Sequence, residues 1–383
     1  MLKCTACGRE YSMRKPYQRC ECGEPLELEP FESVPGIGRR VWKRFSGFFP
    51  FDLKPELSLG EGDTPLTKAK KLSREIGVKV YLKNETTNPT WSFKDRGTYL
   101  GIHRALQLGF KKIGTVSTGN MAASVAAYGA FAGLETYILV SSTIAEEKLK
   151  ALEVYGAKIV KVHGDYGELY YKSLEIGQKK GIYFINSDDP FRVEGYKSIS
   201  FEIIEEITPD YVLVPTSSGG LLRGVVKGFL ELKKSGLIEN LPRFVVVQAE
   251  GCSPICRAFR EGKEKIERFK SPHTIAHAIE NPYPPSGNAV LRRLKELSGL
   301  CVTVRDEEIL EAQRALGREG LFVQPASATG VAAIRKLRER EAIEKGAKVV
   351  GILTGAGLKT LSYIKAPKVE ECLLESFEEC FGE

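Results

Sequence analysis

The sequence predicts an α/β protein with two doubly wound parallel-sheet lobes and a small module at its N-terminus. From residue 78 onward, short apolar runs alternate with helical patterns, which is typical of parallel sheets covered by helices on both faces. A chain of 383 residues can hold more than one domain, and 42% hydrophobic with 27% charged residues is ordinary for a globular protein. No apolar run reaches the roughly 18 residues that a membrane span needs.

Charge and the start of the chain restrict the partners that we expect. The net charge is +7, but the basic residues are spread along the chain, which argues against nucleic acid and allows a basic cleft for a small anion. The chain begins Met-Leu-Lys-Cys, without an apolar signal segment, so we expect a cytoplasmic protein that contacts no membrane. Residues 361–383 are acidic and amphipathic, and we expect a solvated helix or a contact surface there. A monomer and a homodimer both stay open.

Four of the nine cysteines lie in the first 22 residues. They form two knuckles, Cys4-x-x-Cys7 and Cys20-x-Cys22, and four thiolates grouped in this way suit a closed tetrahedral zinc site. Residues 1–30 are too few to bury a core unaided, so the metal would have a structural role. Two disulfides, or a site that has lost its metal, are the alternatives. We expect ordinary buried thiols at the other five positions: Cys252, Cys256, Cys301, Cys372 and Cys380.

The polar stretch 88–97 is the strongest candidate for catalytic chemistry. A strand-like run, 78–82, leads into it, and a helical pattern, 97–108, follows it. We expect Ser92 to cap this helix, which would place Lys94 in the first turn. The positive potential of a helix start makes an ammonium lose its proton more easily, as an amine that forms an imine with an aldehyde requires. The alternative is a solvated lysine in a loop.

Further candidate groups follow the later strands, because ligands gather at the carboxyl ends of parallel strands. The expected strands are 114–117, 136–140, 159–162, 183–186, 211–214, 244–247 and 349–353, and residues 251–300 are expected to be irregular. After the first of these strands, Ser117, Thr118 and Asn120 precede a helix rich in small residues, whose amides can hold a carboxylate. A plain helix cap is the alternative there.

Two more loops combine groups that suit phosphate. Asn186, Ser187 and Arg192 offer an amide, a hydroxyl and a guanidinium fork, which together make a clamp for a tetrahedral anion. The alternative for Arg192 is a surface ion pair with Glu194. The second loop lies at the start of a predicted helix, 221–233, where open amides suit a phosphate. Its candidate residues are Ser217, Ser218, Gly219, Gly220 and Leu221.

These motifs together resemble one known family. The stretch N-P-T-W-S-F-K-D-R-G at 88–97 closely resembles the lysine motif of fold-type II pyridoxal phosphate enzymes, and of threonine synthases in particular. Further segments similar to that family are E-G-D-T-P-L (61–66), S-T-G-N (117–120), N-S-D-D-P-F-R (186–192), Q-P-A-S-A (324–328) and L-T-G-A-G-L-K (353–359). Many threonine synthases also carry a similar pair of cysteine knuckles. The resemblance extends from Met1 to Lys359.

The resemblance implies a tryptophan synthase β-like fold, with pyridoxal 5′-phosphate held as an aldimine on Lys94. Residues 1–30 would form the zinc-ribbon-like module, residues 31–98 with 196–383 the large cofactor-binding domain, and residues 99–195 the small domain. The implied cofactor-binding residues are Phe93, Asn120, Ser217, Ser218, Gly219, Gly220, Leu221 and Thr354. The implied substrate-binding residues are Ser117, Thr118, Asn186, Ser187 and Arg192.

The implied reaction converts O-phospho-L-homoserine and water to L-threonine and phosphate, with Lys94 moving protons at the reacting carbons. Trp91, Met121 and Gln324 depart from the residues usual in threonine synthases, which are glycine, threonine and glutamate, and the Ser-Ser-Gly-Gly loop is closer to dehydratases. These departures leave two enzyme alternatives open: β-replacement on O-phosphoserine, as in cysteate synthase, and a serine or threonine dehydratase. The 186–192 loop favours a phosphorylated amino acid. A zinc-ribbon binding protein with a degenerate catalytic fold is the non-enzyme alternative.

Overall fold

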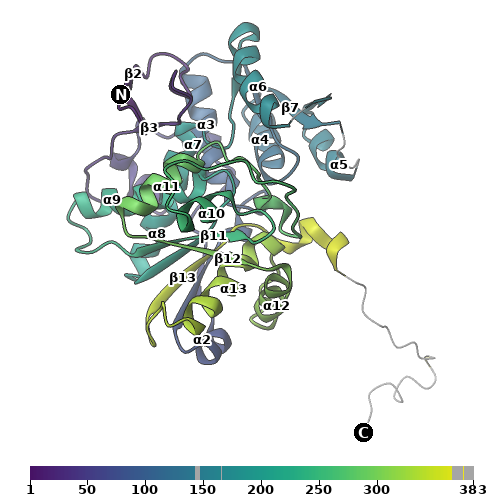
Figure 1. Cartoon of the computed structure of the whole chain (residues 1–383). Helices are drawn as coiled ribbons and strands as arrows, with labels where there is room; N and C mark the ends of the chain where they lie inside the picture. The colour runs from purple at the N-terminus through teal and green to yellow at the C-terminus, as the bar shows by residue number, and fades with distance from the viewer. Residues whose placement is uncertain (143–146, 165, 365–373, 375–383) are drawn as a thin grey trace.

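The computed structural model describes residues 1–142, 147–164, 166–364 and 374. The chain folds around three sheets (Figure 1). Apart from 361–364 and 374, the acidic segment that the sequence analysis expected to be a helix or contact surface lies outside the described residues. Among the described residues, no helix is both long and apolar enough to cross a membrane.

Six strands form the largest sheet: Leu66–Lys68 (β4), Lys79–Asn84 (β5), Tyr211–Pro215 (β10), Arg243–Ala249 (β11), Leu300–Val304 (β12) and Lys348–Leu353 (β13). Their order is β12-β11-β10-β13-β5-β4, and all neighbours run parallel except the edge pair β4–β5. The sequence predicted β5, β10, β11 and β13, whose residues are buried on both faces and so form continuous apolar runs. It missed β4 and β12, which are only partly buried.

Four strands form the second sheet: Lys112–Val116 (β6), Glu135–Ser141 (β7), Lys158–Val162 (β8) and Ile182–Phe184 (β9). Their order is β8-β7-β6-β9, and every pair is parallel. The sequence predicted all four. The α/β class with two parallel sheets is therefore confirmed, while the exact domain boundaries stay a prediction.

Helices cover both faces of the large sheet. The α-helices are Val41–Arg44 (α1), Lys70–Ile76 (α2), Lys94–Gln107 (α3), Asn120–Phe131 (α4), Glu147–Val154 (α5), Tyr166–Lys180 (α6), Pro190–Tyr196 (α7), Ser198–Glu206 (α8), Gly220–Lys234 (α9), Pro254–Arg260 (α10), Gly287–Glu296 (α11), Asp306–Arg318 (α12) and Pro325–Glu339 (α13). Short 3-10 turns are Ser46–Phe48 (η1), Pro55–Leu57 (η2), Glu85–Thr87 (η3), His277–Ile279 (η4) and Gly357–Tyr363 (η5). Figure 1 shows α4, α5 and α6 grouped around β7, away from β11–β13.

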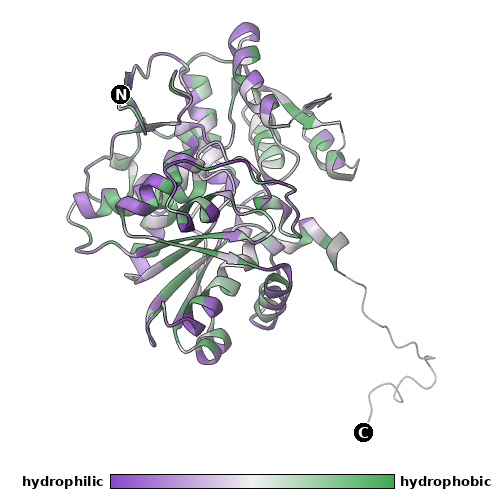
Figure 2. Cartoon of the chain, viewed as in Figure 1, coloured by the Kyte–Doolittle hydropathy of each residue, from purple (hydrophilic) through white to green (hydrophobic). Residues whose placement is uncertain are grey.

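Alternate residues of the same strand enter different cores. In β11, Val246 packs in the core that includes Val225 of α9, whereas Val245 and Val247 pack in the core that includes Ile334 of α13. Figure 2 shows the resulting apolar strands in the middle of the large sheet. This two-sided burial is what a doubly wound parallel sheet requires.

Residues 251–300 are more regular than the sequence analysis expected. They contain α10 and α11, and Pro254 occupies the first turn of α10, where a missing amide proton costs little. Cys256 of α10 forms a disulfide with Cys301 of β12, so the expectation of free thiols at these two positions was wrong. Their spacing of 45 residues in sequence gave no sign of this contact, which depends on α10 packing over β12.

A small antiparallel sheet forms the N-terminal module: Leu2–Cys4 (β1), Glu10–Tyr11 (β2) and Leu26–Leu28 (β3), in the order β2-β1-β3. The core of this sheet includes Phe191, which belongs to α7. The module therefore packs directly on the helix that follows β9.

Candidate active site

Neighbouring strands bring the candidate loops together. In the large sheet, β5, β13 and β10 are adjacent, and their carboxyl ends lead into the lysine turn, Thr354 and the loop before α9. In the small sheet, β6 and β9 are adjacent, and their ends lead into the loops before α4 and α7. The two sets of loops meet, because Asn120 contacts Gln324 and a Cβ on Gly220 would lie 2.5 Å from the Ser187 carbonyl oxygen.

The lysine turn is held by backbone contacts and one carboxylate. The amide of Phe93 donates to the Thr354 carbonyl at 3.1 Å, which fastens the turn to the end of β13. Asp95 accepts from the amide and hydroxyl of Thr90 at 2.7 and 2.6 Å. Ser92 makes no capping bond to α3, so its expected role was wrong, since the Asp95 carboxylate closes the turn instead.

Lys94 is the first residue of α3, as the sequence predicted. Its Nζ lies 4.5 Å from the centre of the Phe93 ring. Burial, and secondly the positive charge of Arg192, lower the pKa of Lys94 to about 7. The half-buried position of Lys94 at the start of α3 excludes a fully solvated loop lysine, and its lowered pKa suits imine chemistry.

Arg192 is fully buried beside the lysine turn. It donates to the Tyr196 hydroxyl at 3.0 and 2.8 Å, to the Thr98 hydroxyl at 3.0 Å and to the Lys94 carbonyl at 3.3 Å. Among the described residues, no carboxylate lies within 4.0 Å of its guanidinium nitrogens. A buried cation without a counter-charge is costly, so this arrangement fits a site that receives an anion.

The alternative interpretation of Arg192 as a surface ion pair is excluded. Glu194 instead bonds Lys197 at 2.5 Å and also pairs with Lys227. The close approach of α7 to α3 explains how Arg192 reaches the turn. A Cβ on Gly195 would lie 2.2 Å from the backbone oxygen of Arg96, so only glycine allows this helix contact.

Asn120 is part of a polar cluster at the start of α4. Its amide donates to Gln324 at 2.8 Å, and its carbonyl accepts from Lys359 at 3.1 Å. Lys359 also donates to the backbone carbonyl of Thr90. Burial lowers the pKa of Lys359 to about 8, although the Asp95 carboxylate acts in the opposite direction. The site therefore holds a second lysine with a depressed pKa.

The start of α9 has the small and hydroxyl residues that a phosphate site requires. Gly219 caps the helix with φ of 95°, a left-handed conformation that favours glycine. The first amides of a helix have no partner within it, and here Ser217 and Ser218 precede them with half-buried side chains. Gly220 and Leu221, the first two residues of α9, are buried.

Thr354 follows β13 directly and is buried. Its hydroxyl lies 2.9 Å from that of Ser327, which also accepts the Gly355 amide at 2.9 Å. The Ser327 hydroxyl has one proton, which it can give to the Gly355 carbonyl at 3.0 Å or to Thr354, and only in the second case is the Thr354 proton left for a ring nitrogen. The structure thus places Ser327 as a partner that the sequence analysis did not identify.

The predicted substrate-binding residues differ in how available their polar groups are to a ligand. Asn186 accepts from the Val116 amide at 3.0 Å and donates to the Ser173 hydroxyl at 3.0 Å, so its amide is mainly used to join α6 to β6. Ser187 and Thr118 are half-buried, and Ser117 is buried with its hydroxyl accepting from the Gly119 amide at 3.3 Å. Ser187 therefore has more access to a ligand than Asn186.

Trp91 has an unusual backbone conformation. Its φ is 59°, its side chain is 53% exposed, and its carbonyl accepts from the Ala356 amide at 3.0 Å. The Lys359 ammonium lies 6.0 Å from the centre of a Trp91 ring. A residue with a Cβ is strained at this φ, which gives a physical reason for glycine at such a position.

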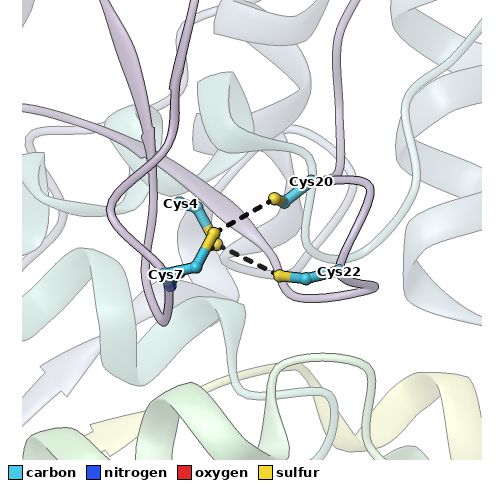
Figure 3. Close-up of side chains that lie close together, drawn as sticks. All are labelled: Cys4, Cys7, Cys20 and Cys22. Carbon is cyan, nitrogen blue, oxygen red and sulfur yellow. Dashed lines mark hydrogen bonds between the residues drawn. The ribbon is translucent and has the colours of Figure 1, made fainter.

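The four N-terminal cysteines converge as the sequence predicted (Figure 3). All four sulfur atoms lie within 4.8 Å of one another, with Cys4 and Cys22 at 3.5 Å and Cys7 and Cys20 at 3.6 Å. Four sulfurs at about 2.3 Å from a tetrahedral zinc would be about 3.8 Å apart, so the quartet fits such an ion. In the described part of the chain this is the one group of its kind.

Sequence reasoning missed several residues of the site. Tyr196 lies one helical turn after Arg192, and that spacing was a usable signal. Lys359 and Asp95 were inside quoted motifs but received no role. Ser327 likewise lay inside a family-like segment without a role, and Thr98 gave no signal, because its contact with Arg192 joins two helices far apart in the sequence.

The chain is similar to known proteins of one family. A family model described as pyridoxal-phosphate dependent enzyme matches residues 57–355. A threonine synthase of Methanocaldococcus jannaschii is 39% identical over 94% of this chain and 93% of its own. A threonine synthase of Methanosarcina acetivorans is 35% identical over 100% of this chain and 98% of its own.

Solved structures show the same fold at lower identity. Maize serine racemase superposes with a TM-score of 0.69 at 23% identity, over 78% of this chain and 89% of that one. Threonine deaminase isoform 2 of Solanum lycopersicum superposes with a TM-score of 0.66 at 23% identity, over 86% of this chain and 93% of that one. The full-length relatives, the family model and the loop arrangement agree, and the chain therefore belongs to the pyridoxal-phosphate dependent enzymes and, within them, to the threonine synthase family.

Proposed function

We propose that the chain converts O-phospho-L-homoserine and water to L-threonine and phosphate, using pyridoxal 5′-phosphate. Relatives named threonine synthase match it over nearly the whole length. The observation that carries the proposal is Arg192, a fully buried guanidinium that contacts the backbone of Lys94 and has no carboxylate partner among the residues that the structure describes. A phosphorylated substrate supplies the missing negative charge at that place.

The residues suited to the cofactor come from the lysine turn and from three further loops. Lys94 would bind the aldehyde, with the Phe93 ring beside it. The start of α9 would hold the cofactor phosphate through the amides of Gly219, Gly220 and Leu221 and the hydroxyls of Ser217 and Ser218. Thr354 would donate to the ring nitrogen, and Asn120 to the ring oxygen.

The remaining residues would hold the substrate and move protons. When bound, the cofactor supplies an electron sink that acidifies the hydrogens on the substrate carbons. The Lys94 amine, with a pKa near 7, can take a proton and return it at pH 7. Ser117 and Thr118 would bind the substrate carboxylate near the start of α4. Arg192 and Ser187, with a smaller part for Asn186, would bind the phosphate as it leaves.

We also propose zinc at the cysteine quartet, because four sulfur ligands at this spacing suit it better than a hard cation. The role is structural, since four protein ligands leave no open position. Location in the cytoplasm and a homodimer stay predictions from the sequence.

A comparison of substrates tests the proposed activity. The purified protein should release phosphate from O-phosphohomoserine with formation of threonine, and much more slowly from O-phosphoserine. It should release little ammonia from unphosphorylated serine or threonine. Phosphate release from O-phosphoserine alone would favour β-replacement, and rapid ammonia release from serine would favour a dehydratase.

A further inference from the structure

The N-terminal module reaches the loop before α7 through Gln18, which lies between the two cysteine knuckles. Its amide donates to the Asp189 carboxylate at 2.7 Å and to the Phe184 carbonyl at the end of β9. Asp189 is the N-cap of α7 and accepts from the amides of Phe191 and Arg192 at 2.9 and 3.2 Å. The module therefore holds the cap that sets the position of Arg192.

Arg19 makes a second link, and it joins two loops. Its side chain is 9% exposed and pairs with Asp188, whose carboxylate also accepts from the Tyr170 hydroxyl. The same guanidinium donates to the Pro285 carbonyl at 3.1 Å. The next residue, Ser286, donates its amide to the Ser218 carbonyl at 3.0 Å. Arg19 thus connects the proposed substrate-phosphate loop with the neighbour of the proposed cofactor-phosphate loop.

The cysteine quartet fixes the position of Arg19. Arg19 directly precedes Cys20, and its Nε donates to the Gly23 carbonyl at 3.0 Å. The Gly23 amide in turn donates to the Cys20 carbonyl at 2.9 Å, which closes the second knuckle. A metal on the sulfurs would hold this knuckle, and with it the guanidinium, in one conformation.

Arg9 provides the contrast within the same module. It also lies between the cysteine pairs, but its side chain is 55% exposed and its ion-pair partner is Glu21, which is 77% exposed. An exposed pair of this kind contributes little to structure, whereas the buried, charge-assisted contacts of Arg19 fix geometry.

We propose that Arg19 is a positioning residue through which the metal-binding module holds the two phosphate loops in register. This inference rests on the proposed function, because it concerns how tightly the site binds a phosphorylated substrate. Arg19 touches neither substrate nor cofactor. Loss of Arg19 would leave the buried Asp188 without its cation, and loss of the metal would release the knuckle that holds Arg19 in place, so either change would let both loops move apart.

The test compares Arg19→Met with Arg9→Met in the full-length enzyme, with the metal and cofactor contents of each measured. Hydrogen exchange of the peptides covering 184–196 and 284–290 reports on the loops independently of turnover. In Arg19→Met we expect exchange at the Phe191 and Arg192 amides to be about tenfold faster or more, with metal retained. KM for O-phosphohomoserine should rise about tenfold, with kcat changed much less, because the loops contribute binding. Arg9→Met should change none of these.

Metal removal supplies a second arm. Chelation of the unmodified protein should accelerate exchange at the same amides. In Arg19→Met its further effect there should be smaller, because only the link from Gln18 to Asp189 is left to lose. Arg19→Lys, which keeps the charge but cannot reach both loops, should fall between the two and serves if Arg19→Met does not fold. Three results would each overturn the proposal. They are unchanged exchange at 184–196 in Arg19→Met, loss of the metal from that variant, and a chelation effect confined to residues 1–30. If the proposed substrate is wrong, KM is undefined but the exchange result still decides.

Discussion

Arg192→Met is the substitution that best separates function from stability at this site. Arg192 makes four hydrogen bonds to uncharged groups and has no carboxylate within 4.0 Å in the described part of the chain. A charge-assisted hydrogen bond to an anion contributes about 1.5–3 kcal/mol, so a guanidinium fork on phosphate contributes about 3–6 kcal/mol. At about 1.4 kcal/mol for each factor of ten, kcat/KM for O-phosphohomoserine should fall at least about 100-fold.

The folded state should tolerate the same change. Methionine removes a buried, uncompensated charge, which offsets the lost bonds to Tyr196 and Thr98, so we expect the free energy of unfolding to change by less than about 2 kcal/mol. Phosphate release measures the activity, and denaturant unfolding measures the stability. Arg192→Lys, which keeps the charge without the fork, should lose less activity. A loss of more than about 3 kcal/mol in stability, with kcat/KM nearly unchanged, would show that Arg192 is structural.

Three further predictions concern the surroundings of the turn. Without cofactor, the free energy of unfolding should rise relative to that of Lys94→Met as the pH rises from 7 to about 10. The pKa of Lys94 is lowered to about 7 in the folded protein, so in this range the unfolded chain binds more protons than the folded one. Unfolding at a series of pH values measures this, and a fall in relative stability would exclude a neutral amine. Trp91→Gly should be about 1 kcal/mol more stable than Trp91→Ala, because φ of 59° strains any residue with a Cβ; equal melting temperatures would contradict that reasoning. Gln324→Glu should raise the pKa of Lys359 above about 8, because Asn120 contacts both residues and a carboxylate at 324 would favour the charged ammonium. The pH dependence of acylation at Lys359 measures this pKa. An unchanged pH profile would show that residue 324 does not influence Lys359.

The repeating part of the fold was predictable because burial on both faces leaves continuous apolar runs in the sequence. This is why β10 and β13 were found, whereas β12, only partly buried, was missed. The disulfide between Cys256 and Cys301 could not be predicted, because it depends on how α10 packs over β12.

The sequence could indicate candidate residues where a loop carries its own chemistry, as at Lys94 and at the start of α9, and their roles stay predictions. The site was not predictable where residues act through tertiary contacts. Nothing in the sequence marks Ser327 as the partner of Thr354, or Asn186 as a residue whose amide is used within the protein. Arg192 was predicted as a candidate, but its lack of a carboxylate partner among the described residues, which makes it informative, is visible only in the folded chain.

The most direct test of the proposed reaction is turnover of O-phosphohomoserine in ¹⁸O-labelled water. If phosphate leaves by cleavage of the carbon–oxygen bond and water adds at the neighbouring carbon, the label appears in the hydroxyl group of threonine and not in the released phosphate. Cleavage of the phosphorus–oxygen bond would instead give labelled phosphate and unlabelled homoserine. Labelled threonine is the result we predict, and labelled phosphate with homoserine would contradict the proposed function.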